Sequence, residues 1–126
     1  MSDAYHTPVL LNEALGLFIT RRNGTYVDGT LGGGGHAEEV CKRLDDGRLL
    51  CFDADADAIR YASERLKPWS HKVTFVHSNF RNLKSELAAR NILFIDGLLL
   101  DLGVFSFQFD EEEKGFSFRG DERIDM

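Results

Sequence analysis

The chain has 126 residues, of which 43% are hydrophobic and 29% are charged, and its formal net charge is −6. This composition is typical of one soluble globular domain. The acidic balance argues against a strongly basic nucleic-acid surface, although an acidic protein can still carry a local basic groove. No apolar run approaches the roughly 20 residues of a membrane-spanning helix, and no secretory signal opens the chain. We therefore expect a cytoplasmic protein without a membrane partner.

Helical and strand patterns alternate along the chain as far as Asp101. The apolar spacing of residues 9–18 predicts a helix, with Pro8 in its first turn. Short apolar or β-prone runs then predict four strands, at residues 25–28, 48–52, 72–77 and 98–100. Helical patterns separate the strands, at residues 36–44, 53–66 and 82–91. After Asp101, aromatic residues alternate with polar residues and glycines, and we expect a loop there.

This order of elements predicts an α/β fold. Strands separated by helices of this length make right-handed crossovers and a parallel sheet. We expect a doubly wound, Rossmann-like sheet with flanking helices, in which the strand at residues 25–28 is central and the strand at residues 98–100 is its neighbour. Ligands of such sheets bind outside the carboxyl ends of the strands.

Four consecutive glycines, Gly32–Gly35, lie between the first predicted strand and the next helix. Glycine there permits a tight turn with positive φ and lets a ligand approach the main chain. The run satisfies the dinucleotide fingerprint G-x-G-x-x-[GA], but four glycines in a row match many templates. The lysine of a phosphate-binding P-loop is absent, which disfavours ATP and GTP. A flexible linker is the alternative, and the strand and helix that directly flank the run argue against it.

Three aspartates end predicted strands and narrow the choice of ligand. Asp28 suits a ligand with a cationic ammonium group and suits a pyrophosphate poorly, since like charges repel. Asp53 can accept both hydroxyls of a ribose. S-adenosylmethionine, a nucleoside with an amino-acid tail, satisfies both. Asp101 would face the same crevice, close to the reacting centre. The alternative for Asp28 is that it caps the turn that follows it, and the alternative for Asp101 is that it caps a helix or a turn.

The two cysteines, Cys41 and Cys51, show neither a CxxC motif nor the spacing of His and Cys metal ligands. Cys41 lies in a helical pattern and Cys51 in a strand pattern. We expect both to be reduced thiols in the core, and the sequence predicts no metal site.

Six segments follow one another in order: HTPVLLNEAL, YVDGTLGGGGH, FDAD, NF, DGLLLDLGV and GFSFRGDERIDM. With these segments in this order, the chain resembles the N-terminal part of the bacterial small-subunit ribosomal RNA (cytosine-N4)-methyltransferase family. The resemblance runs from about Tyr5 to Met126. The resemblance implies a class I methyltransferase that uses S-adenosylmethionine. It also implies that the substrate is the exocyclic amine of one cytidine in the decoding region of small-subunit ribosomal RNA.

The resemblance implies particular site residues as well. The implied cofactor contacts are Gly34, Gly35, His36, Asp53, Phe80, Asp101 and Gln108. Phe80 would lie near the adenine and Asp53 on the ribose side. Asp101 is the predicted catalytic residue, because a carboxylate that accepts an N4 hydrogen would localise the lone pair of the amine. From the residues alone, Phe80 is predicted to be a core residue and His36 a residue at a helix N-terminus.

The chain departs from the family pattern at two places. Where the family usually has Asp-Leu-Gly-Val-Ser-Ser-x-Gln, this chain has DLGVFSFQ, so Phe105 replaces a serine and Phe107 adds a second bulky ring. Family members also continue well beyond Met126. We therefore expect residues 1–126 to be a partial S-adenosylmethionine-binding domain, truncated after the fourth strand. It would be inactive alone and would meet ribosomal RNA through the missing part.

Two other functions fit parts of the sequence. A nicotinamide oxidoreductase would use the G-x-G-x-x-A match and Asp53, but Asp28 and the lack of a plausible hydride-transfer acid argue against it. A non-catalytic interaction module would use the aromatic C-terminal residues, and their exposure would lead the chain to self-associate. These residues are Phe105, Phe107, Phe109, Phe116 and Phe118.

Overall fold

A computed structural model describes residues 15–16, 18–100, 103–110 and 115–124, the last two ranges as backbone strands. Its strands are β1 (Thr25–Asp28), β2 (Arg48–Asp53), β3 (Val73–His77), β4 (Gly97–Leu100), β5 (Gly103–Asp110) and β6 (Gly115–Ile124). Its helices are α2 (Gly35–Arg43), α3 (Ala56–Arg65) and α4 (Leu83–Ala89), with short 3-10 turns η2 (Lys67–Trp69) and η3 (Phe80–Asn82). Residues 15, 16 and 18 are helical, and the rest of the helix predicted at residues 9–18 lies outside the described residues.

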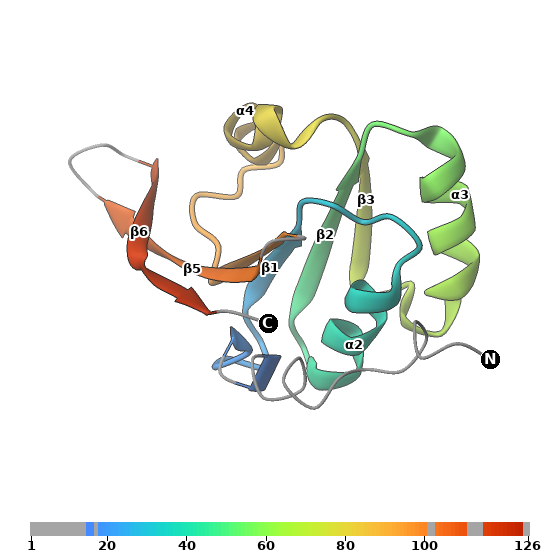
Figure 1. The fold of residues 1–126 in the computed structure, drawn as a ribbon, viewed down its shortest axis with the longest axis horizontal. Coiled ribbons are helices and arrows are strands. Elements are labelled where there is room, and N and C mark those ends of the chain that lie inside the picture. The colour runs from blue at the N-terminus through green and yellow to red at the C-terminus, as the bar shows by residue number, and fades with distance from the viewer. Residues whose placement is uncertain (1–14, 17, 101–102, 111–114, 125–126) are drawn as a thin grey trace.

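The strands form one sheet in the order β3-β2-β1-β4-β5-β6 (Figure 1). β1 pairs in parallel with β2 and with β4, and β2 pairs in parallel with β3. The predicted parallel sheet, with the strand at residues 25–28 between its neighbours, is therefore confirmed. The four parallel strands and their helices are the Rossmann-like arrangement expected from the sequence.

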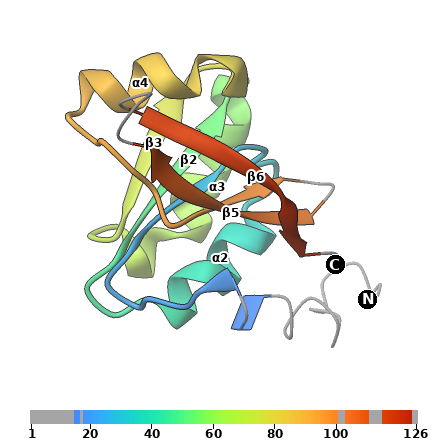
Figure 2. The ribbon, with the colours of Figure 1, turned by 90° about the vertical axis from the view of Figure 1, so that its left-hand side faces the viewer.

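The expectation of a loop after Asp101 is wrong for residues 103–110 and 115–124. β5 pairs antiparallel with β4, and β6 pairs antiparallel with β5 in a register that sets Phe107 opposite Phe118 and Phe109 opposite Phe116. Figures 1 and 2 show this hairpin at the end of the sheet away from α3. The alternation of aromatic and polar residues is the two-residue period of a strand. β5 forms because the edge of β4 offers backbone hydrogen-bond partners, and a local sequence pattern cannot show that this edge is available.

The core has two layers, one on each face of the parallel strands. Leu49 and Cys51 of β2 pack in the cluster that includes residues of α2 and α3, and Leu50 and Phe52 pack in the cluster that includes residues of α4. Figure 2 shows α2 and α4 on opposite sides of the sheet. Successive side chains of a strand point to opposite faces, so a strand buried on both faces is a continuous apolar run. This is why β2 was predictable from its sequence.

Thr25, the first residue of β1, is hydrogen-bonded to Asp96, the residue before β4. Asp96 N donates to Thr25 O over 2.6 Å, and Thr25 N donates to Asp96 Oδ2 over 2.8 Å. Gly29 N continues the junction by donating to Leu99 O over 2.9 Å. The Thr25 bonds hold the amino end of β1 beside the segment that leads into β4, and the Gly29 bond holds its carboxyl end beside β4. Within the described part of the chain, no helix has the length and apolar character needed to cross a membrane.

Candidate functional site

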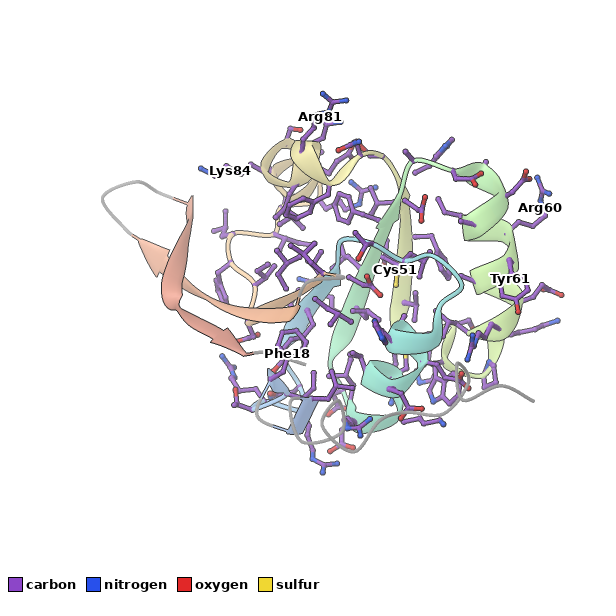
Figure 3. The ribbon with its side chains drawn as sticks, viewed as in Figure 1. Phe18, Cys51, Arg60, Tyr61, Arg81 and Lys84 are labelled. Atoms are coloured by element: carbon purple, nitrogen blue, oxygen red, sulfur yellow. The ribbon has the colours of Figure 1, made fainter. Side chains whose placement is uncertain are left out.

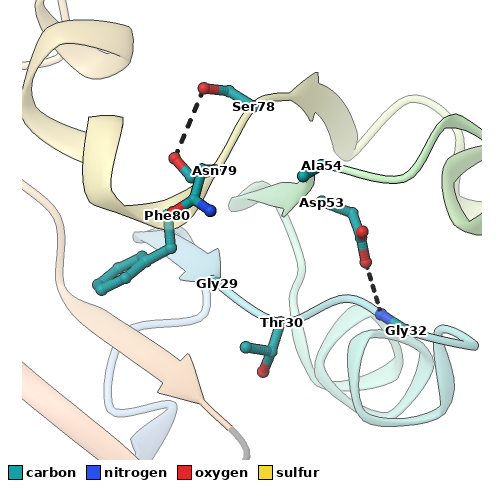
Figure 4. Close-up of a pocket in the computed structure, with 8 residues that line it drawn as sticks. All are labelled: Gly29, Thr30, Gly32, Asp53, Ala54, Ser78, Asn79 and Phe80. Atoms are coloured by element: carbon teal, nitrogen blue, oxygen red, sulfur yellow. Dashed lines mark hydrogen bonds between the residues drawn. The ribbon is translucent and has the colours of Figure 1, made fainter.

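A pocket of about 400 Å³ opens at the carboxyl ends of β1, β2 and β3 (Figure 4). Its lining consists of Gly29, Thr30, Gly32, Asp53, Ala54, Ser78, Asn79 and Phe80. This is the edge of a parallel sheet at which ligands of such folds bind. The volume lies within the range of about 300–1,000 Å³ that is typical of small-molecule sites.

Asp53, at the end of β2, faces the glycine turn across this pocket. Its Oδ2 accepts a hydrogen bond from Gly32 N over 3.2 Å, and its Oδ1 accepts one from Asp55 N over 2.9 Å. Figure 4 shows the carboxylate directed at the turn. Because a carboxylate oxygen has two lone pairs, each oxygen keeps one acceptor position for a ligand hydroxyl. The structure therefore brings together two of the features singled out in the sequence.

The run Gly32–Gly35 forms the turn from β1 into α2. Gly32 has a φ of 52° and Gly34 a φ of 86°, both in the left-handed region that favours glycine. Gly34 is the N-cap of α2, and its N–H donates to Leu31 O over 2.9 Å. The tight turn expected from the sequence is confirmed.

The predicted cofactor residues Gly34, Gly35 and His36 stand at the N-terminus of α2. They are not among the residues that line the pocket, whereas Gly32, two positions earlier, is. A Cβ at Gly35 would point at the Arg65 guanidinium, 3.7 Å away. Their contacts with a cofactor stay predictions.

Phe80 lies both at the core and at the pocket, and its contact with the adenine stays a prediction. It is half-buried, packs against the core cluster that includes α4 residues, and lines the pocket (Figure 4). Its position depends on Gly29, since a Cβ at Gly29 would lie 2.8 Å from Phe80 Cδ2 and 2.6 Å from Leu100 Cδ2. The ring can therefore lie over the end of β1 only because residue 29 has no side chain.

Five pocket residues were not predicted: Gly29, Thr30, Ala54, Ser78 and Asn79. Each follows a strand end within two residues, so the rule that ligands bind beyond the carboxyl ends could have found them. Asn79 Oδ1 accepts from Arg81 N over 2.9 Å, and Ser78 Oγ accepts from Asn82 Nδ2 over 3.1 Å. These hydrogen bonds hold Ser78 and Asn79 in place on the side of the pocket next to β3.

Asp28 is almost completely buried, at 1% exposure, and its Oδ1 accepts from Thr30 N over 3.0 Å. The structure thus shows the turn-capping interaction that was the alternative for this residue. Its role as partner of a ligand ammonium stays a prediction. Asp101, the predicted catalytic residue, lies outside the described residues. Gln108 belongs to the backbone of β5 opposite Ser117, and its side chain also lies outside the description.

The two cysteines are free and buried, as predicted. Burial raises the pKa of the Cys41 thiol to about 12, and burial raises the pKa of the Cys51 thiol well above its usual range. A cysteine acts as a nucleophile through its thiolate. At neutral pH both thiols are protonated and inaccessible, so neither can act as a nucleophile.

The fold is similar to that of solved S-adenosylmethionine-dependent methyltransferases. The O-methyltransferase TomG of Streptomyces achromogenes, solved in complex with SAM, matches with a TM-score of 0.58 and 20% identity over 75% of this chain and 45% of that chain. A SAM-dependent O-methyltransferase of Thermotoga maritima matches with a TM-score of 0.55 and 14% identity over 71% of this chain and 32% of that chain. At these identities the likeness establishes the fold alone.

Residues 3–126 match the model of the MraW methylase family, and the chain belongs to this family. It is 44% identical over 121 residues to the ribosomal RNA small subunit methyltransferase H of Finegoldia magna, and 47% identical over 125 residues to that of Clostridioides difficile. The matches cover 96% and 98% of this chain and 39% and 40% of the relatives. The chain thus spans about two fifths of the length of these relatives. The resemblance drawn from the sequence motifs is confirmed.

Proposed function

We propose that the chain is the S-adenosylmethionine-binding part of an enzyme that methylates the N4 amine of a cytidine in small-subunit ribosomal RNA. The observation that carries the proposal is the Asp53 carboxylate, which faces the glycine turn across the pocket with both oxygens anchored by backbone N–H groups. Membership of the MraW methylase family and the names of the relatives support the substrate class.

The residues present fit this cofactor. Asp53 would accept the ribose hydroxyls, and Phe80 would lie against the adenine. The turn Gly32–Gly35 would leave the main chain open to the amino-acid end. When bound, S-adenosylmethionine supplies a methyl group on a good leaving group, a sulfonium. The volume of about 400 Å³ and the mixture of one aromatic ring, one carboxylate and two glycines suit a nucleoside ligand.

The proposed reaction is in-line attack by cytidine N4 on the methyl carbon. The amine is a weak nucleophile because its lone pair is delocalised into the ring. Asp101 would accept an N4 hydrogen, which localises the lone pair and orients it. Alignment of the two reactants can contribute on the order of 7–11 kcal/mol. The cytidine must be single-stranded or flipped, because a paired N4 amine is inaccessible.

The chain spans about two fifths of its relatives, so we propose that it binds the cofactor and that methyl transfer needs the remainder of the protein. Ribosomal RNA would be the partner of the whole protein, and we place the reaction in the cytoplasm for that reason. Self-association through the aromatic hairpin is not required by this function.

Calorimetric titration with S-adenosylhomocysteine tests the proposal, and NADH is the competing ligand. The chain should bind S-adenosylhomocysteine, and Asp53→Ala should weaken binding about tenfold to a hundredfold, because hydrogen bonds to a charged group are lost. Asp46→Ala is the matched control. Asp46 is exposed in the turn between α2 and β2, at the opposite edge of the sheet. This variant should bind like the unaltered chain.

Failure of the folded chain to bind S-adenosylhomocysteine would overturn the assignment of the cofactor to these residues. Binding of NADH alone would favour the oxidoreductase. Equal losses in Asp53→Ala and Asp46→Ala would show that Asp53 makes no specific contact.

A further inference from the structure

The two sides of the pocket carry opposite charge. On the α3 side stand Asp53, Asp55 and Asp57, and the nearby Arg60 is engaged by Asp57 Oδ1 at 2.9 Å. On the η3 and α4 side stand Arg81 and Lys84, both exposed. Neither forms an ion pair with any residue that the structure describes. The pocket thus lies between an acidic side and a basic side.

The local backbone places Arg81 directly after a pocket residue and Lys84 three positions further along the chain. Phe80 lines the pocket, and Arg81, the next residue, has its N–H bound to Asn79 Oδ1 at 2.9 Å. Leu83 and Leu87 are buried, which anchors α4 on the sheet and leaves Lys84 exposed in its first turn. Figure 3 shows Arg81 projecting from η3 and Lys84 from the first turn of α4, while Arg60 and Tyr61 project from α3 on the other side.

We propose that Arg81 and Lys84 contact backbone phosphates of the substrate RNA and position its single strand on the α4 side of the pocket. This inference rests on the proposed function. A nucleotide whose N4 amine reaches the methyl group of a cofactor bound in the pocket carries its flanking phosphates over one side of the pocket or the other. Asp53 and Asp55, which form no ion pair with a described residue, repel phosphates on the α3 side, and the two cations attract them on the α4 side. Because the net charge of the chain is −6, two cations without ion-pair partners among the described residues have a stronger influence on where the RNA strand lies.

The test is the salt dependence of RNA binding by the Arg81→Gln/Lys84→Gln variant of the full chain. The probe is a 12-nucleotide single-stranded RNA with a central cytidine, measured by fluorescence anisotropy between 50 and 200 mM salt with saturating S-adenosylhomocysteine. The matched control is Arg22→Gln/Lys67→Gln. Arg22 and Lys67 are also exposed, but they precede β1 and β3 at the opposite edge of the sheet. Both variants lose the same charge.

Each phosphate contact with a single strand contributes about 0.7 to the slope of log K against log salt, so the test variant should lose a slope of about 1.4. That corresponds to roughly 25-fold weaker binding at 0.1 M salt, by the same relation. The control should keep the slope of the unaltered chain. Three outcomes would overturn the proposal that Arg81 and Lys84 contact the RNA. They are equal losses of slope in both variants, an unchanged slope in the test variant, and no RNA binding by the unaltered chain.

Titration with S-adenosylhomocysteine separates this outcome from the proposed function. If every variant binds that ligand and the test variant keeps the salt dependence of RNA binding, the proposed role of Arg81 and Lys84 is wrong and the cofactor site stands. If the unaltered chain fails to bind the ligand, the proposed function fails, whatever the RNA slope shows.

Discussion

The glycines of the turn and the glycines at the strand ends are needed for different reasons. A Cβ added at Gly32, Gly33 or Gly35 would have its nearest neighbour at 3.7–4.0 Å, so these positions have room for a side chain, and at Gly34 the nearest neighbour would be at a tight 3.3 Å. A Cβ at Gly29 or Gly97 would have its nearest neighbour at 2.6 or 2.2 Å. In the run Gly32–Gly35, glycine is thus required by the left-handed backbone at two positions, Gly32 and Gly34. The isolated glycines are required because neighbouring side chains fill the space.

The largest effect on stability is expected for Gly97→Ala. A Cβ there would lie 2.2 Å from Phe18 Cε1, and the buried Phe18 ring packs on Tyr26 with ring centroids 5.1 Å apart. Overpacking of this kind should lower the free energy of unfolding by about 3 kcal/mol, measured by urea denaturation. Gly16→Ala is the control, since nothing lies within 4 Å of its Cβ position. It should be neutral or stabilise by up to about 1 kcal/mol. Equal effects of the two changes would contradict the steric explanation.

Gly29→Ala should affect both stability and the pocket. The new Cβ would press on Leu100 and on the Phe80 ring, so we expect a loss of about 2 kcal/mol in the free energy of unfolding. Displacement of the ring should also weaken S-adenosylhomocysteine binding about tenfold, or roughly 1.4 kcal/mol. Phe80→Leu is the companion variant, which reduces the ring contact without overpacking. A Gly29→Ala protein that binds the ligand normally would show that the position of Phe80 is unimportant.

A smaller loss of stability is expected for Gly34→Ala. A left-handed backbone costs a residue with a Cβ about 1–2 kcal/mol, and Gly34 has a φ of 86°. Its Cβ would also lie 3.3 Å from Ala62 Cβ. The same substitution in an Ala62→Gly background separates the two causes. If backbone strain dominates, the loss should persist there. Full rescue would mean that the contact with Ala62 explains the effect.

The smallest effect is expected for Gly35→Ala. The residue begins α2, and its Cβ would make only ordinary contact with Arg65 at 3.7 Å. Stability should change by less than about 1 kcal/mol, with alanine favoured inside a helix. Ligand affinity should stay within about twofold, because the methyl group would contact Arg65, which does not line the pocket. A large loss of S-adenosylhomocysteine binding at normal stability would show that the ligand approaches Gly35 from the α3 side.

The parallel part of the fold was predictable because its signals are local. β2 is a continuous apolar run, and the buried residues of α2, Ala37, Val40 and Cys41, have helical spacing. The hairpin β5–β6 was missed although Phe105, Phe107 and Phe109 alternate with polar residues at strand spacing. Whether such a segment becomes a strand depends on the available edge of β4, and that edge exists only after the sheet has formed.

The site was predictable in part for the same reason. Asp53 and the glycine turn stand out as a carboxylate and a run of glycines, but nothing in the sequence states that they share a hydrogen bond. Ser78 and Asn79 are ordinary loop residues until β3 places them beside the turn. Phe80 could be assigned from the residues to the core alone, whereas the structure places it both in the core and at the pocket.

The bonds between Thr25 and Asp96 have a consequence for the order in which the chain assembles during synthesis. They join residues 71 positions apart, whereas β1 meets β2 across a single helix. Closing the longer loop costs more chain entropy, and long-range pairings form late. We expect β1, β2 and β3 to associate first, with the β4 edge of β1 open until Asp96 has left the ribosome. Pulsed hydrogen exchange during refolding should then protect the amide of Leu49, which bonds to Lys72 O, before that of Gly29, which bonds to Leu99 O.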